Sequence, residues 1–324
     1  MITMTEIARL THVSQPTVSR VLNGNKAVDP EIRERVLACA REHNYQSNAL
    51  AKGLQGSQTH LLGVFLHNIS NSFFADLAQE IEARAREHGY SIILFNSGHD
   101  PQKQLECMDV VRRYRVDGVL MVPVLRESEM WQECVDRLDV PMVVVTRQVT
   151  GFDSVYVDHE AAGQQVARHL AAQNYERFLF IGRPTDTKFK GFSQELETMG
   201  KVSGNEIGCF EYEDDEKFLQ ALKEWIGDSK QRVGIFANND LWAMRTLKAL
   251  QKLNISIPEE VGVIGFDNIY MDRYLQPSLS SVSQPIAQMA EESVNRLLHR
   301  INHPDETKAL DVPLQATLIP REST

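Results

Sequence analysis

Residues 3–25 read TMTEIARLTHVSQPTVSRVLNGN, a stretch that carries the signals of two short helices joined by a tight connection. Thr3 is placed to cap a helix over residues 3–10, and Glu6 lies three residues further on, which is the spacing of a reciprocal capping box. Ser14 is placed to cap the second helix. Two short helices in this arrangement predict a helix-turn-helix, whose second helix enters the major groove of DNA.

The second helix is expected to end near Leu22, and Pro16 lies in its first turn, where a missing N–H removes no helical hydrogen bond. In a helix-turn-helix this first turn reaches base edges, and hydroxyl side chains around it bond phosphate oxygens. Arg20, one turn further on, suits a phosphate or a guanine edge. The residues of the head that we predict to contact DNA are Thr3, Thr5, Ser14, Gln15, Pro16, Thr17, Ser19, Arg20 and Asn23.

A third helix is predicted to begin at Asp29-Pro30-Glu31, because the aspartate is a suitable cap, the proline suits the first helical position and the glutamate complements the helix dipole. Its apolar residues fall on one face, and they are Ile32, Val36, Leu37 and Ala40. Three short helices bury such faces only against one another, which predicts a three-helix head.

The charge distribution favours nucleic-acid contact at one end of the chain. The 324 residues are 42% hydrophobic and 24% charged, with a net charge of −10. Residues 1–60 have a formal charge of +2, which leaves −12 for the remainder. A mildly basic head on an acidic body suits DNA binding by the head alone. No apolar run is long enough to span a membrane and no secretory signal begins the chain, so we expect a cytoplasmic, nucleoid-associated protein.

Motifs of metal sites and of enzymes are not found in the sequence. The four cysteines show no C-x-x-C spacing and no nearby histidine partner, which favours reduced, mostly buried thiols and no metal. No G-x-G-x-x-G follows a strand, and neither G-x-S-x-G nor a phosphate loop occurs. The sequence therefore predicts neither an enzyme nor a cofactor.

Beyond residue 60, apolar strand-like runs alternate with amphipathic stretches. Strands are predicted at 61–67, 90–96, 117–123, 141–146, 177–182, 233–238 and 261–267. Helices are predicted at about 72–88, 101–114, 160–173, 215–226, 240–253 and 286–302. This alternation is typical of parallel sheets covered on both faces, and its length predicts two doubly wound α/β subdomains.

Several of these motifs, in this order, are similar to those of the lactose-repressor (LacI/GalR) family. They include V-S-Q-P-T-V-S-R-V-L-N-G at 13–24, A-L-A-K-G-L-Q-G at 49–56, A-N-N-D at 237–240, V-G-V-I-G-F-D-N at 261–268 and L-Q-A-T-L-I-P-R-E-S at 314–323. The resemblance covers essentially the whole chain. It implies a DNA-binding head, a hinge and a periplasmic-binding-protein-like body.

For DNA binding, the resemblance implies that Gln15-Pro16 is the pair that reads the operator. Proline departs from the commoner pattern and offers no donor, so readout is expected to lean on Gln15, Thr17 and Arg20.

The segment 46–59 matches the family's hinge helix, which folds on the operator and inserts a leucine into a central base step. Leu54 occupies that position, and Asn48, Ala49 and Ala51 would face the minor groove. Gly53 is expected to weaken the hinge by roughly 1 kcal/mol relative to alanine.

For the body, the resemblance implies two lobes with a small ligand, the effector, between them. Asp267 matches the acidic residue that accepts hydrogen bonds from ligand hydroxyls, and Asp240 is expected either to join it or to cap the following helix. Lys188 stands where the family usually has arginine, and Thr146 where many members have aspartate. The predicted effector contacts are Asn71, Phe73, Phe74, Arg147, Lys188, Asn239 and Asp267.

The predicted domains are a headpiece at 1–46, a hinge at 47–59 and an effector-binding and dimerisation domain at 60–324. Within the last, one lobe would comprise about 60–157 and 287–316, and the other about 158–285. The family's tetramer-forming leucine tail is not seen after Pro320, so a homodimer on a near-palindromic double-stranded operator is expected.

The predicted function is a repressor of a carbohydrate-utilisation operon, controlled by a sugar or sugar acid. Two alternatives stay open. One is a regulator of the same family that is co-repressed by a purine or another metabolite, and the other is a sugar-binding module without a regulatory role.

Overall fold

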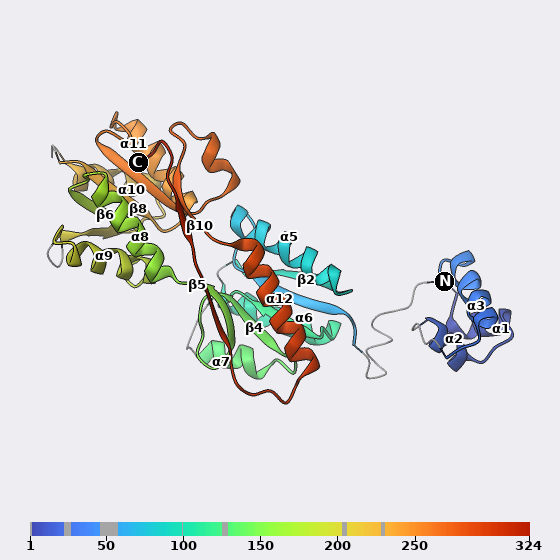
Figure 1. The fold of residues 1–324 in the computed structure, drawn as a ribbon. Helices are drawn as coiled ribbons and strands as arrows, with labels where there is room; N and C mark the ends of the chain where they lie inside the picture. The colour runs from blue at the N-terminus through green and yellow to red at the C-terminus, as the bar shows by residue number, and fades with distance from the viewer. Residues whose placement is uncertain are drawn as a thin grey trace. The chain divides into compact units, whose positions relative to one another are not determined.

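The computed structural model forms two compact units, Met1–His60 and Leu61–Thr324 (Figure 1). The residues that it describes are 2–22, 27–45, 58–98, 100–124, 129–202, 206–227 and 231–324. Asn23 and the predicted hinge contacts Asn48, Ala49, Ala51 and Leu54, together with Gly53, lie outside these residues.

The first unit contains three helices among its described residues, α1 (Met4–Leu10), α2 (Gln15–Leu22) and α3 (Pro30–Glu42). The local signals in the sequence act as predicted: Thr3 and Glu6 form the capping box, and the Asp29 carboxylate caps α3 just before Pro30. The three helices share one apolar core, which consists of Ile7, Ala8, Val18, Val21, Val36 and Ala40.

The second unit contains two six-stranded sheets. The first has the order β11-β5-β4-β3-β1-β2, with every neighbouring pair parallel. Its strands are β1 (Leu61–Leu66), β2 (Ser91–Asn96), β3 (Gly118–Met121), β4 (Met142–Thr146), β5 (Asp153–Val157) and β11 (Asp311–Leu314). Helices α5 (Ser72–Glu87) and α12 (Ile286–Asn302) pack in the core on one face, and α6 (Pro101–Tyr114) and α7 (Glu129–Asp136) on the other.

The second sheet has the order β12-β10-β9-β8-β6-β7, and only β12 runs antiparallel to its neighbour. Its strands are β6 (Arg177–Ile181), β7 (Gly208–Phe210), β8 (Val233–Ala237), β9 (Val261–Asp267), β10 (Ser280–Ser283) and β12 (Thr317–Ile319). Helices α8 (His159–Ala172) and α9 (Thr187–Thr198) cover one face, and α10 (Asp215–Ile226) and α11 (Asp240–Lys252) the other. A short 3-10 helix, η2 (Tyr270–Tyr274), follows β9.

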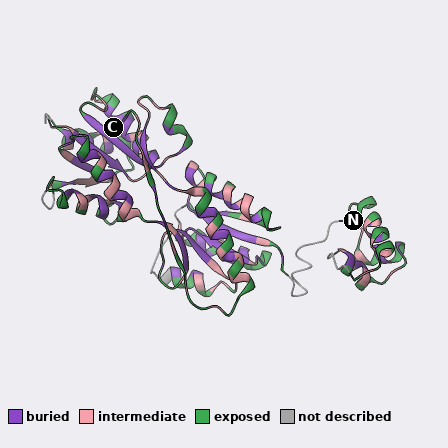
Figure 2. Ribbon diagram, in the orientation of Figure 1, coloured by how far each residue is buried: buried purple, intermediate pink, exposed green. Residues whose placement is uncertain are grey.

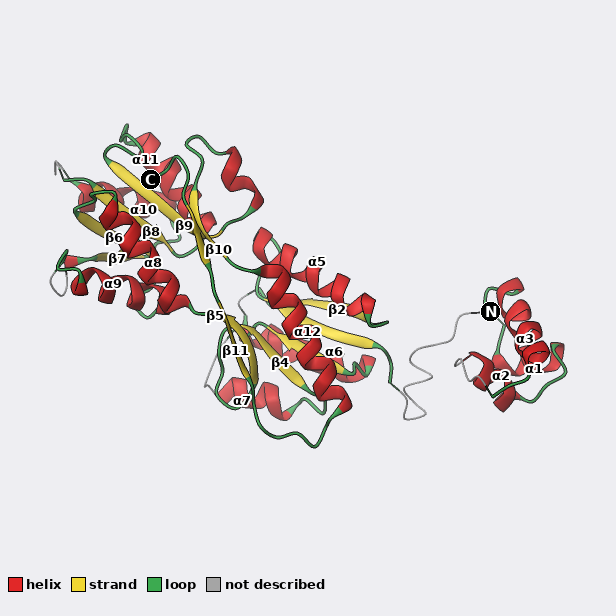
Figure 3. Ribbon diagram, in the orientation of Figure 1, coloured by secondary structure: helices red, strands yellow, loops and turns green. Residues whose placement is uncertain are grey.

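The chain passes between the two sheets after β5, after β10 and after β11, as Figure 3 shows. The central strands are buried, the edge strands β2, β7, β11 and β12 are partly exposed, and the outer helix faces are exposed, so each sheet lies between two layers of helices (Figure 2). This architecture confirms the predicted fold class, a helix-turn-helix head with two doubly wound α/β subdomains.

Each predicted strand and helix is present within one or two residues of its expected position, but several short elements were not predicted. The unpredicted elements are α7, α9, η2, β5, β7, β10, β11 and β12. Strand β10 reads SSVS, so no apolar run marked it. Ser280 and Ser281 are nevertheless buried, because their hydroxyls pair with Arg321 and Thr324 and with Asp240. Helix α9 contains Gly191 in its middle, which weakened the helical pattern.

That glycine has a packing role, since it allows α8 and α9 to cross closely. A Cβ on Gly191 would lie 2.0 Å from the carbonyl oxygen of Glu160, and one on Gly163 would lie 2.2 Å from that of Lys188. Only glycines permit this approach, which fixes the first turn of α9 and the side chain of Lys188.

Candidate nucleic-acid interface and candidate ligand pocket

Helix α2 has one face buried in the headpiece core, while its first turn is exposed. Val18 and Val21 are buried in the headpiece core, whereas Gln15, Pro16 and Arg20 are exposed. The sequence spacing thus leaves the residues that are predicted to read bases free of the core. This is the arrangement that a recognition helix needs.

The start of α2 is held by a local side-chain contact. The Thr17 backbone N–H donates to Ser14 Oγ at 3.3 Å, and the two side-chain hydroxyls are 2.8 Å apart. Ser14 is therefore the cap that the sequence predicts. Both residues keep hydrogen-bonding capacity for phosphate oxygens, because a hydroxyl has one donor and two acceptor lone pairs.

The turn between α1 and α2 is braced from α3. Arg35 Nε donates to the Thr11 carbonyl at 3.1 Å, and Thr11 Oγ1 donates to the Ile7 carbonyl at 2.6 Å. On α1, Thr3 and Thr5 are exposed, and the Thr3 hydroxyl donates to Glu6 at 2.9 Å. Their contact with DNA stays a prediction.

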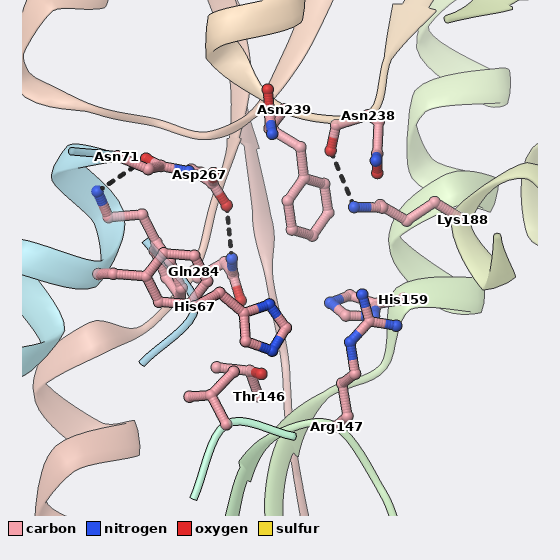
Figure 4. Close-up of a pocket in the computed structure, with 14 residues that line it drawn as sticks. His67, Asn71, Thr146, Arg147, His159, Lys188, Asn238, Asn239, Asp267 and Gln284 are labelled. Atoms are coloured by element: carbon pink, nitrogen blue, oxygen red, sulfur yellow. Dashed lines mark hydrogen bonds between the residues drawn. The ribbon is translucent and has the colours of Figure 1, made fainter. Parts of the chain in front are cut away.

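In the second unit, a cavity of about 140 Å³ lies among residues from both sheets (Figure 4). All seven predicted effector contacts line it. The other lining residues are His67, Val122, Thr146, His159, Asn238, Phe266 and Gln284. By the measure in which one water needs roughly 10–15 Å³, this cavity has room for a small ligand that replaces several waters.

Asp267, at the end of β9, connects the two sheets across the cavity. Its Oδ1 accepts from Gln284 Nε2 at 2.7 Å and its Oδ2 accepts from Asn71 Nδ2 at 3.4 Å (Figure 4). Burial raises the pKa of this carboxyl to about 6, while the nearby Lys188 ammonium opposes that rise. The carboxylate thus ties α5, which covers the first sheet, to the end of a strand in the second.

Lys188 lies in the first turn of α9, and its ammonium is buried. Its Nζ donates to the Asn238 carbonyl at 2.8 Å and lies 4.4 Å from the centre of the Phe266 ring. Burial lowers the pKa of this ammonium, because the charged form loses hydration in the protein interior.

The amino-terminal ends of helices surround the cavity. Asn71 caps α5 through the Phe73 N–H at 3.1 Å, and Asn239 caps α11 through the Trp242 N–H at 3.0 Å. His159 is the first residue of α8. Because parallel strands end where the next helix begins, these polar groups converge at one edge of each sheet.

Asp240 neither lines the cavity nor caps α11. It is 1% exposed, and its two oxygens accept from the Ser281 hydroxyl at 2.5 Å and from the Ile269 N–H at 2.9 Å. Burial raises its pKa well above the ordinary value. The expectation that Asp240 caps α11 was wrong, since Asn239 takes that position and Asp240 instead fixes the loop after β9.

Aromatic rings form much of the wall. Phe73 is buried in the hydrophobic core, whereas Phe74 is half-buried and lies 5.6 Å from the ring centre of His67. The His159 ring meets Phe266 edge-on at 5.4 Å. A half-exposed phenyl face suits stacking on a ligand ring better than the enclosed Phe73 does.

Two lining residues adopt uncommon backbone conformations. Thr146 has φ +73° and Asp267 has φ +115°, although β-branched and charged residues seldom occupy this region. Such conformations cost free energy and cluster at binding sites. At the ends of β4 and β9 they direct side chains into the cavity.

The lining residues absent from the predicted set share one signal, which is their place at strand ends. His67 follows β1, Asn238 follows β8 and Gln284 follows β10. Gln284 could not be placed from the sequence because β10 itself was not predicted. Asn238 lies in the A-N-N-D motif and Thr146 stands where many members of the family have aspartate, but neither was among the predicted effector contacts.

The described residues also bear on the expectations for cysteines, metal sites and membrane spans. Of the four free cysteines, Cys134 is buried and the others are half-buried, so "mostly buried" was too strong. Within the described ranges, no group of three or more metal-ligating side chains gathers. No described helix combines the length and apolar character of a membrane span.

The chain is similar in sequence to known families and to characterised proteins. Residues 3–48 match "Bacterial regulatory proteins, lacI family", and residues 167–324 match "Periplasmic binding protein-like domain". The ribose operon repressor of Halalkalibacterium halodurans is 30% identical, over 100% of this chain and 97% of the relative. The transcriptional repressor PurR of Haemophilus influenzae is 28% identical, over 94% of this chain and 93% of the relative.

A similar fold is found in the lac repressor dimer solved with operator and the anti-inducer ONPF. The TM-score is 0.85 with 22% identity, over 99% of this chain and 98% of that chain.

Proposed function

From the premise that the chain belongs to the lacI family of bacterial regulatory proteins, and is thus a DNA-binding transcription regulator, we propose that it represses a carbohydrate-utilisation operon. The proposed effector is a sugar or sugar acid, bound in the cavity that Asp267 crosses. The similarity to a ribose operon repressor supports a carbohydrate effector. The protein acts in the cytoplasm by binding, not by catalysis.

The exposed first turn of α2 is the proposed reader of the operator. Gln15, Thr17 and Arg20 would contact base edges, while Pro16 offers only an apolar contact, for example with a thymine methyl group. Ser14 and Ser19 would bond phosphates. The segment 47–59 is the proposed hinge, and Leu54 its intercalating residue.

One observation supports the proposal that a ligand controls DNA binding. The seven residues predicted as effector contacts come from both sheets and line one cavity, which the Asn71–Asp267 hydrogen bond crosses. A ligand there would bind one arrangement of the two lobes better than another. The resulting change in DNA affinity cannot exceed the ratio of the ligand's affinities for the two arrangements.

A homodimer is part of the proposal. A dimer would place two α2 helices roughly 34–36 Å apart on a near-palindromic operator. On the second-sheet half, an apolar groove of about 440 Å³ includes Leu247, Ile257 and Leu275. The nearby Tyr270 and Tyr274 are 60% and 61% exposed. Apolar surface of this kind marks a contact site, and a second copy of the chain is the proposed occupant.

A purine-responsive co-repressed regulator is the second candidate, and the similarity to PurR favours it. Either ligand could stack on Phe74, but a sugar needs more hydrogen-bond partners than a nucleobase does. Most of the lining side chains are polar. This supports a hydroxylated ligand over a flat base.

The test uses the full chain and DNA selected from a randomised library. The account predicts a near-palindromic consensus with two half-sites one helical turn apart, and a light-scattering mass near twice 36.8 kDa. A thermal-shift screen with sugars, sugar acids and purines then identifies the ligand class, because a bound ligand raises stability by mass action. Selection of no consensus, or a consensus with one half-site, would contradict the proposal.

A further inference from the structure

The short helix η2 has one carboxyl group on its inner side. Tyr270 and Tyr274 are exposed, whereas Asp272, between them in the sequence, is 0% exposed. No side chain caps the first turn of η2. A single 3-10 segment has poor hydrogen-bond geometry and depends on its surroundings for stability. The contacts of Asp272 therefore decide how firmly η2 is fixed to the second sheet.

The Asp272 carboxyl receives no hydrogen bond from an N–H or O–H group of the described residues. Both of its oxygens are buried without such a partner, and the group within hydrogen-bonding reach is the carboxyl of Asp240. The Arg321 guanidinium donates elsewhere, to the Leu279 carbonyl and to Asn268 Oδ1, both at 2.5 Å. Two ionised carboxylates offer each other only acceptors. A hydrogen bond between the two carboxyl groups therefore requires a proton on one of them.

The Asp240 carboxyl is enclosed on its other sides. Its Oδ1 accepts from the Ser281 hydroxyl at 2.5 Å, and its Oδ2 accepts from the Ile269 N–H at 2.9 Å. A Cβ on Gly265 would lie 2.0 Å from Oδ1, so the backbone of β9 packs directly against the carboxyl. The Ile269 carbonyl in turn accepts from the Asp272 N–H at 3.1 Å. Both carboxyl groups thus act on the loop that joins β9 to η2.

Burial and neighbouring charges favour one proton on this pair at neutral pH. Burial raises the pKa of Asp240 well above its ordinary value, and the Asp267 carboxylate adds to the rise. Burial raises the pKa of Asp272 to about 6, while the hydrogen bond from Asp240 opposes that rise. The described cations that act on the pair are Lys188 on α9, Arg273 on η2 and Arg321 in the C-terminal segment. Above pH 6, Asp240 thus keeps a proton that it donates to the Asp272 carboxylate.

We propose that Asp240 and Asp272 share one proton, and that this carboxyl pair is a pH-sensitive switch that fixes the β9–η2 loop. Loss of the proton at alkaline pH leaves two buried carboxylates in contact, and their repulsion loosens η2. Because β9 ends at Asp267 and η2 carries Tyr270 and Tyr274, the pair supports both a wall of the cavity and part of the proposed contact between copies. The switch goes beyond the proposed function, but its effect on dimerisation rests on that proposal.

The shared proton can be observed on the full chain with aspartate that is isotopically labelled at the side-chain carboxyl. At pH 8 Asp267 is ionised, since its pKa is about 6, and infrared spectroscopy should still show the carbonyl stretch of a protonated carboxylic acid. The band should disappear in Asp240→Asn and in Asp272→Asn, because the amide then supplies the donor. Asp305→Asn is the matched control, since Asp305 is exposed, and it should keep the band.

The effect of the proton on η2 is measured by hydrogen exchange. The amides to follow are those of Asp272 and Leu279, which donate to the carbonyls of Ile269 at 3.1 Å and of Asp272 at 2.9 Å. Wild type and Asp272→Asn are compared at the same pH, so that the intrinsic pH dependence of exchange cancels. Between pH 7 and 9.5 the wild type should accelerate about tenfold relative to the variant, the effect of one pKa unit. The variant should not respond because its amide donor does not titrate.

The consequence for assembly is measured by sedimentation equilibrium. The dissociation constant of the wild-type dimer should rise about tenfold over the same pH range and stay constant in Asp272→Asn. Asp305→Asn should follow the wild type.

The inference is overturned if the wild type shows no protonated carboxylic acid at pH 8, if the band persists in both amide variants, or if wild type and Asp272→Asn exchange alike over the whole range. Its failure is separable from that of the proposed function. A stable dimer without the acid band would refute the switch and leave the proposed function standing. A chain that is monomeric at every pH, yet shows the band and the accelerated exchange, would support the switch and contradict the proposed dimer.

Discussion

The headpiece and the body place their candidate functional groups in opposite ways. On α2, Gln15, Pro16 and Arg20 project from an exposed turn that local contacts hold, so neighbouring residues in the sequence define the surface. In the body, Lys188 and Asp267 are buried, and they line one cavity because packing around the second sheet brings α9 close to the end of β9. The comparison teaches that a local site is readable from a short motif, while a buried site depends on the packing around it.

The largest expected effect concerns the headpiece, where α2 is the proposed reader of DNA. Arg20→Ala should remove about 2 kcal/mol of operator affinity per half-site, roughly a thousandfold for a dimer, because a side chain at a base edge is lost. Fluorescence anisotropy on the selected operator measures it. Arg41→Ala on α3 is the control, since Arg41 is exposed and pairs with Glu34, and should change affinity little. Equal losses in both variants would show that α2 is not the reader.

What the sequence predicted follows the same division. The caps at Thr3, Ser14 and Asp29 are local hydrogen bonds, so the residue types and spacing sufficed. The seven pocket residues were placed through a family resemblance, and they line one cavity. The partners of Lys188 and Asp267 were not predictable. Asn238 acts through its backbone carbonyl, and Gln284 follows a strand without an apolar pattern.

The close crossing of α8 and α9 tests whether the cavity depends on contacts between segments that are distant in the sequence. Gly191→Ala would place a methyl group against the Glu160 carbonyl, and such overpacking costs about 3 kcal/mol. We expect a lower melting temperature of the full chain. We also expect weaker ligand binding, because a shift of α9 would displace Lys188. Gly63→Ala is the control, because its nearest neighbour would be 3.5 Å away. Comparable losses at both glycines would refute the role of the α8–α9 crossing.

The buried carboxyl of Asp267 predicts a pH effect that the exposed headpiece should lack. The pKa of its folded form, about 6, exceeds the ordinary 3.8, so folding binds this proton more tightly. Its stabilising contribution is complete below pH 3.8 and is lost as pH rises through 6. Relative to the wild type, Asp267→Asn should therefore gain up to about 3 kcal/mol between pH 4 and 7. A difference in melting temperature that stays constant over this range would contradict the assignment.

The smallest expected effect is local to the headpiece. Asp29→Ala removes the cap that accepts from the Glu31 N–H at 2.9 Å, and such a loss costs about 1 kcal/mol. Hydrogen exchange should accelerate roughly fivefold for the amides of α3 and remain unchanged around Lys188 and Asp267. Faster exchange at the cavity would show that the two regions are not independent in stability.

The central claim is that occupancy of the cavity and binding of DNA are coupled. The most direct measurement determines operator affinity with and without saturating ligand, and ligand affinity with and without operator, on the same full-length protein. The account predicts that both affinities change by the same factor, between about 5 and 150, since coupling is reciprocal. A ligand that binds in the cavity while both factors equal one would contradict it.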